Sequence, residues 1–111
     1  MHASPKPGGG AFEGRGVKTM RERMVDELGA QLDEHANVVV VLADISAALF
    51  ELARCEHPDR VINVGIREQA LVGVTAGLAA AGMRPVAHTF APFLVARPFE
   101  QLKLDLCHQR W

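Results

Sequence analysis

The residue with the clearest capacity for chemistry is Glu68. It follows the apolar segment 61–66, which contains Gly65, and it precedes residues 70–81, a stretch of alanine, glycine and aliphatic side chains. Between such neighbours the carboxylate is expected to be partly buried, which costs free energy unless a partner meets it. Two interpretations are open on these residues alone. Glu68 either stabilises the first turn of a helix through the helix dipole or contacts a ligand.

Asp44 is a second candidate because it follows residues 38–43, a continuous aliphatic run that begins with four valines. Such a run is typical of a strand covered on both faces in a parallel sheet. Open α/β sheets bind ligands at the carboxyl ends of their strands, where Asp44 would lie. An N-cap role for the short helix expected at residues 47–54 is an equally good interpretation, and the two roles are compatible.

Phe90 and Phe93 form a third group, together with the arginine that follows them. Their spacing of three places both rings on one side of a helical turn, where they can stack on a planar ligand or fill the core. Arg97 lies three residues before Glu100 and could form a surface ion pair with it. His88 falls at a predicted strand end and is interpreted as structural.

Composition excludes several functions. The 111 residues carry 12 basic and 13 acidic side chains in mixed order, which gives no basic patch for nucleic acid or an anionic membrane. No apolar stretch reaches the length of a membrane span, and the histidines and cysteines lack the spacing of a metal site. Cys55 and Cys107 lie far apart without a secretory signal, so we expect free thiols and a cytoplasmic protein.

The remaining pattern predicts an α/β fold behind a tail. Residues 1–16 are rich in glycine and proline and are expected to be disordered, and residues 17–111 form the domain. A helix is predicted from Val17, with Thr19 and Glu22 as a capping box and a stripe of apolar residues facing the core: Met20, Met24, Leu28 and Leu32. Strands are predicted at 38–43, 60–64 and 84–89, and further helices at 47–54, 66–81 and 97–109.

This order predicts three parallel strands with helices on both faces, a partial doubly wound sheet. Three strands are few for such a sheet, and the chain stops where a fourth strand would follow. We therefore expect a fragment, or a chain that depends on a partner for its open edge.

Three sequence blocks occur in order along this fold: 42–46, then 63–69 with 76–79, then 89–93 with 97–101. Together they resemble the first half of the pyrimidine-binding domain of transketolase, closest to the short bacterial form whose carboxyl-terminal half is a separate subunit. The resemblance covers residues 18–109. It implies the thiamine-diphosphate-binding fold and the transfer of a two-carbon ketol unit between sugar phosphates.

The resemblance also implies roles for individual residues. Glu68 matches the catalytic glutamate, whose carboxyl group bonds the pyrimidine nitrogen of the cofactor, and Phe90 and Phe93 match aromatic positions against that ring. Asp44 and Ile45 match further contacts at the cofactor site. Arg97 matches an arginine that faces the substrate.

Other parts of the site are expected from partners. The family binds the diphosphate and its Mg²⁺ or Ca²⁺ through a Gly-Asp-Gly motif in a different domain, and this sequence has no such motif. The resemblance therefore implies a diphosphate-binding domain or subunit in a homo- or hetero-oligomer, with no metal ligand in this chain. Two alternatives stay open: a truncated, inactive remnant that at most binds a partner, and a deoxyxylulose-phosphate synthase. The interval from Phe90 to Arg97 favours transketolase, because it is shorter in the synthases.

Overall fold

The computed structural model describes residues 16–111, so the predicted tail lies outside the described residues except for Gly16. The elements follow the predicted order of alternating helices and strands. They are α2 (Met20–Glu34), β1 (Val38–Leu42), the 3₁₀ turn η1 (Ala47–Phe50), α3 (Glu51–Glu56), β2 (Val61–Asn63), α4 (Glu68–Ala80), β3 (Arg84–His88), α5 (Ala91–Val95), α6 (Phe99–Gln101) and the π-helical turn η2 (Leu102–Cys107).

The three strands form one parallel sheet in the order β2-β1-β3, which confirms the predicted fold class. The central strand β1 pairs with β2 from Val40↔Val61 onward and with β3 from Val38↔Arg84 to Leu42↔His88. All five residues of β1 are buried. The β-branched run therefore has the environment expected of a strand covered on both faces.

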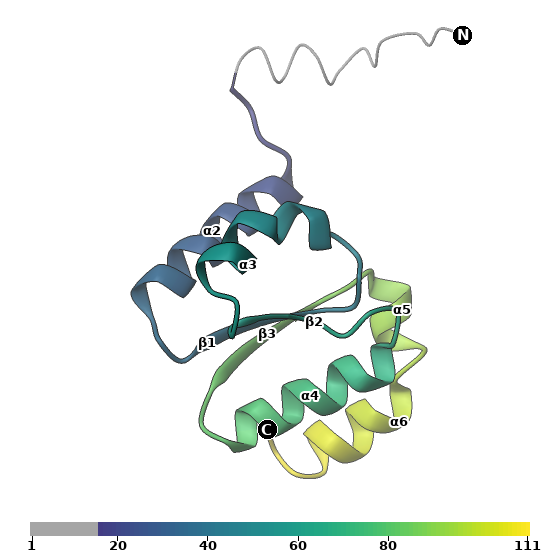
Figure 1. Cartoon of the computed structure of the whole chain (residues 1–111). Coiled ribbons are helices and arrows are strands. Elements are labelled where there is room, and N and C mark those ends of the chain that lie inside the picture. The colour runs from purple at the N-terminus through teal and green to yellow at the C-terminus, as the bar shows by residue number, and fades with distance from the viewer. Residues whose placement is uncertain (1–15) are drawn as a thin grey trace, which may run out of the picture.

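Helices cover the two faces of the sheet as separate layers. Figure 1 shows α2 and α3 on one side and α4 with α6 on the other. Val38, Val40 and Leu42 point into the first layer with Phe50, whereas Val39 and Val41 point into the second with Leu71. This alternation follows from the two-residue repeat of a strand.

Helix α2 begins as predicted but packs over a shorter length. Thr19 caps it through a complete capping box with Glu22, and Leu28 and Leu32 are buried. The prediction that Met20 faces the core is wrong, because its side chain is 89% exposed. A helix of 15 residues is about 22 Å long, whereas a five-residue strand spans about 17 Å, so the first turn of α2 extends past the sheet.

The carboxyl-terminal helix also differs from the prediction. In place of one amphipathic helix over residues 97–109, the chain forms α6 and then η2, and Phe99 is 64% exposed. Pro98 is the N-cap of α6, so the helix begins only after it. The helix expected at 47–54 is likewise divided, into η1 and α3.

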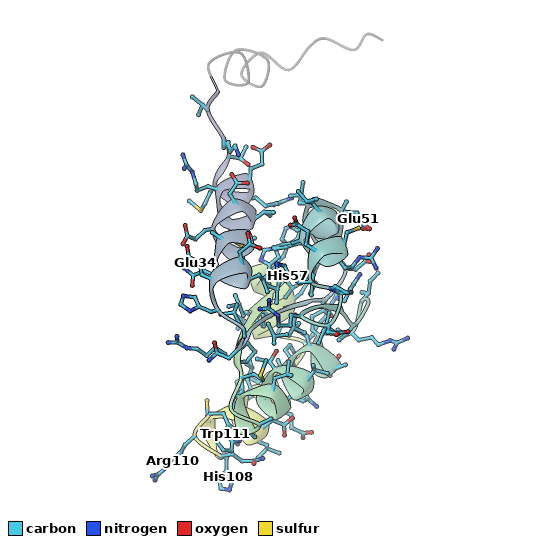
Figure 2. The ribbon with its side chains drawn as sticks, turned by 60° about the vertical axis from the view of Figure 1, so that its left-hand side comes forward. Glu34, Glu51, His57, His108, Arg110 and Trp111 are labelled. Atoms are coloured by element: carbon cyan, nitrogen blue, oxygen red, sulfur yellow. The ribbon has the colours of Figure 1, made fainter. Side chains whose placement is uncertain are left out.

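Arg60 ties the first layer to the sheet. Its guanidinium donates hydrogen bonds to the carbonyl groups of Leu32, His35 and Val38, at the end of α2 and the start of β1. It also donates to Nδ1 of His57, which lies between α2 and α3 (Figure 2). No helix in residues 16–111 combines the length and apolar character needed to cross a membrane.

Candidate functional site

The topology places a crevice at the carboxyl ends of β1 and β3. The strand β1 has β2 on one side and β3 on the other, so the order of the strands reverses direction at β1. Open α/β sheets bind ligands at the carboxyl ends of the strands where such a reversal occurs. A hydrogen bond of 3.1 Å between Nε2 of His88 and Oγ of Ser46 joins the two strand ends. His88, interpreted from the sequence as structural, therefore lies at this crevice.

The loop after β1 has an unusual backbone. Asp44 and Ser46 both adopt left-handed conformations, with φ of 69° and 65°, which cost free energy for residues other than glycine. Ser46 precedes η1, and the Asp44 side chain does not cap that turn, so the N-cap alternative for Asp44 is wrong. Asp44 is exposed and Ile45 is half-buried.

Asn63 holds this loop in place, a role that sequence analysis missed. Its side-chain oxygen Oδ1 accepts hydrogen bonds from the backbone N–H groups of Asp44, at 2.9 Å, and Gly65, at 3.0 Å. Gly65 has a φ of 80°, which favours glycine. Asn before such a glycine turn was the available signal, because Asn side chains commonly accept from the backbone two residues on.

Glu68 is the buried acid of the site. It is the first residue of α4 and is 2% exposed. Its Oε1 accepts a hydrogen bond from Nη1 of Arg97 at 3.0 Å. Its Oε2 is also buried and has no hydrogen-bond partner among residues 16–111. The hydroxyl oxygen Oγ1 of Thr89, which follows β3, is likewise buried and without a hydrogen-bond partner among these described residues.

Arg97 links Glu68 to the aromatic pair. Its guanidinium carbon lies 4.0 Å from the centroid of the Phe93 ring, and its carbonyl oxygen accepts a hydrogen bond from Nε2 of Gln69. The alternative of an ion pair between Arg97 and Glu100 is wrong, because the arginine pairs with Glu68. The structure thus brings Glu68, Phe93 and Arg97 into one cluster.

Phe90 lies beside this cluster, 6.0 Å from Phe93 between ring centroids. It also lines a groove of about 650 Å³ between the start of α2, η1 and the end of β3. The guanidinium carbon of Arg21 lies 5.3 Å from the centroid of the Phe90 ring. Burial, and secondarily the charge of Arg21, lowers the pKa of His88 in the same groove below its ordinary value.

Asp33, Glu56 and His57 bring three possible metal-binding atoms within 4.8 Å of one another. Arg60 donates to Nδ1 of His57, so the neutral ring carries its hydrogen on Nε2, which then donates to Asp33 at 2.7 Å. A metal ion needs the lone pair of that nitrogen and would also face the charge of Arg60. We interpret Asp33, His57 and Arg60 as a structural hydrogen-bond network.

Comparison with known proteins gives the family. Residues 17–111 match the family described as "Transketolase, pyrimidine binding domain". The chain belongs to this family. A solved structure described as "Split gene transketolase, inactive beta4 tetramer" is similar with a TM-score of 0.70 and 37% identity, over 80% of this chain and 30% of that chain.

Three curated relatives extend the comparison. An "Uncharacterized 33.6 kDa protein in fasciation locus" of Rhodococcoides fascians is 56% identical over 74% of this chain and 26% of its own length. A subunit of the apulose-4-phosphate transketolase of Actinobacillus succinogenes is 43% identical over 77% of this chain and 28% of its own length. A "1-deoxy-D-xylulose-5-phosphate synthase" of Pseudarthrobacter chlorophenolicus is 40% identical over 82% of this chain and 14% of its own length. The chain thus spans between 14% and 28% of the length of these relatives.

Proposed function

We propose that this chain supplies the pyrimidine-side wall of a thiamine diphosphate site in a transketolase-type enzyme, which transfers a two-carbon ketol unit between sugar phosphates. The observation that carries the proposal is the carboxylate of Glu68, buried at the first turn of α4 with one oxygen left without a partner among the described residues. A buried acceptor without a partner is costly and needs an explanation, and a ligand that bonds it is one.

The residues present fit an aminopyrimidine ring. A carboxyl group can hydrogen-bond a ring nitrogen, and the rings of Phe90 and Phe93 offer flat apolar surface for stacking. When bound, thiamine diphosphate supplies a nucleophilic carbon that accepts the two-carbon unit. In this proposal Glu68 holds a proton at the ring nitrogen, Phe90 and Phe93 orient the ring, and Asp44 and Ile45 line its surroundings.

The remaining functions of the site are assigned to other domains. These 111 residues contain no Gly-Asp-Gly, so we assign the diphosphate and its Mg²⁺ or Ca²⁺ to a separate domain or subunit in an oligomer. The predicted contact of Arg97 with the sugar phosphate stays a prediction, because its guanidinium is engaged by Glu68 in this structure.

A deoxyxylulose-phosphate synthase is the second candidate, supported by the 40% identity to the synthase of Pseudarthrobacter chlorophenolicus. By the resemblance, the seven-residue step from Phe90 to Arg97 supports transketolase instead, because this interval is usually shorter in the synthases. The third candidate is a truncated, inactive remnant that at most binds a partner. An assay of the enzyme assembled with a diphosphate-binding subunit distinguishes them: ketol transfer between sugar phosphates, formation of 1-deoxy-D-xylulose 5-phosphate, or neither.

Glu68→Gln in the same assembled enzyme tests the central assignment. The amide keeps the size and one hydrogen bond but cannot hold the proton, so turnover should fall by about 100-fold or more. Glu100→Gln is the matched control, because Glu100 is exposed on the neighbouring α6 and should leave turnover unchanged. Near-normal turnover of Glu68→Gln at saturating cofactor would remove the catalytic assignment and leave Glu68 as an acid of the first helical turn.

A further inference from the structure

Two of the three residues expected to hold the pyrimidine, Glu68 and Phe93, are engaged by one side chain of the protein itself. The guanidinium of Arg97 donates to Oε1 of Glu68 at 3.0 Å and lies 4.0 Å from the centroid of the Phe93 ring. A guanidinium is a planar group with N–H donors at its edge and a π face. An aminopyrimidine is likewise planar with a π face, and its ring nitrogen can share one proton with a carboxyl group, so the carboxyl group of Glu68 and the ring of Phe93 can recognise either group.

The exposed fractions of the two side chains show which member of the ion pair reaches solvent. The side chain of Glu68 is 2% exposed, whereas that of Arg97 is 43% exposed. Of the two bonded side chains, Arg97 is therefore the one that reaches solvent. A ring that approached Glu68 from solvent would meet Arg97 first.

We propose that Arg97 is an internal occupant of the pyrimidine subsite, which it holds in the cofactor-free chain and leaves when the aminopyrimidine binds. This inference rests on the proposed function and adds a mode of regulation to it. Release by side-chain rotation leaves the backbone of Arg97 in place, because that backbone is held separately by the hydrogen bond from Gln69 to its carbonyl oxygen. The freed guanidinium then has the solvent side of the site available to it.

The energetics explain why the occupant is present. Without Arg97, the buried carboxylate of Glu68 would have no partner among the described residues at either oxygen. Leaving a buried charge unpaired is strongly unfavourable. With Arg97 in place, the Glu68 side chain is 2% exposed and its unpartnered Oε2 is buried as well, so an entering ring must displace the guanidinium before it can bond either oxygen. The apparent affinity for the ring is then the intrinsic affinity multiplied by the fraction of time that the subsite is open.

The test is a nuclear magnetic resonance titration of the full 111-residue chain with 4-amino-2,5-dimethylpyrimidine, a probe without diphosphate. In the wild-type chain, the Nε–H resonance of Arg97 should move toward the position of free arginine as the Phe93 ring signals shift. Arg97→Leu should bind the probe roughly twofold to fivefold more tightly, as expected when a partly exposed ion pair no longer competes. It should also melt at a lower temperature.

Arg23→Leu is the control, because Arg23 is exposed on α2 and should change neither quantity. Equal or weaker binding by Arg97→Leu, or binding to the wild-type chain that leaves the Arg97 resonance unmoved, would overturn the inference. The second of these results needs no variant to fold. Probe binding that Glu68→Gln does not weaken would refute the proposed pyrimidine site instead. The absence of saturable binding in both the wild-type chain and Arg97→Leu would refute both proposals.

Discussion

Arg60→Ala should be among the most destabilising changes outside the core. The guanidinium donates to the carbonyl oxygens of His35 at 2.7 Å, Leu32 at 2.8 Å and Val38 at 3.1 Å. The carbonyls of Leu32 and His35 lie at the end of α2, where backbone acceptors lack helical partners, so Arg60 satisfies them from another part of the chain. The carbonyl oxygen of His35 also accepts a longer hydrogen bond, of 3.3 Å, from the backbone N–H of Val38.

The magnitude follows from the kind of hydrogen bond. A bond from a charged donor contributes about 1.5–3 kcal/mol when buried and less when water can replace it. Since Arg60 is half-buried and its bond to His35 is exposed, we expect a total loss of about 2–4 kcal/mol. For a domain of this size, that loss lowers the melting temperature by roughly 10–20 °C.

Thermal and urea unfolding followed by circular dichroism measure the loss. Arg54→Ala is the matched control, because among the described residues Arg54 pairs only with Glu51, on the surface of α3. This variant should melt within about 2 °C of the wild type. Arg60→Lys should fall between the wild type and Arg60→Ala, since one ammonium cannot reach all three carbonyls. Equal melting temperatures for Arg60→Ala and Arg54→Ala would refute this account.

Two further predictions concern glycine and pH. Gly77 lies within α4 and Gly82 has a φ of 91°, and an added Cβ would meet nothing within 4 Å at either position. Gly77→Ala should therefore raise the free energy of unfolding by about 0.5–1 kcal/mol, because alanine favours a helix, and Gly82→Ala should lower it by a similar amount, because alanine disfavours a positive φ. Urea unfolding of both variants measures the two changes, and changes of the same sign would contradict this reasoning. Burial and Arg21 place the pKa of His88 below its value of 6.5 in the unfolded chain, so its contribution to stability is present above pH 6.5 and is lost as the pH falls below it. Melting temperatures between about pH 7.5 and 5.5 should thus decline less in His88→Gln than in the wild type, and parallel curves would contradict the assignment.

The parts of the fold that the sequence predicted correctly depend on local patterns. The valine run at the start of β1 predicts a buried central strand because residues facing both ways are apolar. The capping box of Thr19 and Glu22 spans three residues and forms as predicted. Burial of Glu68 follows from its apolar neighbours on both sides.

The contacts that were not predicted join distant parts of the chain. Arg97 lies 29 residues from Glu68, whereas Glu100 is the nearby acid that sequence spacing offered as its partner. Which carboxylate the arginine reaches depends on the packing of α5 and α6 against α4, which no local pattern encodes. The exposure of Met20 has a similar origin, because the length of the sheet decides where the core stops.

The ion pair of Glu68 therefore connects the stability of the domain to its proposed function. A carboxylate suited to hold a proton on a ligand must be buried, and a buried carboxylate destabilises the free domain unless a cation pairs with it. Arg97 provides that cation from a side chain that is 43% exposed and so reaches solvent. A fully buried partner would stabilise the free domain but would exclude the ring, and the absence of a partner would leave the charge uncompensated. A half-exposed arginine satisfies both requirements, which accounts for its place between Glu68 and Phe93.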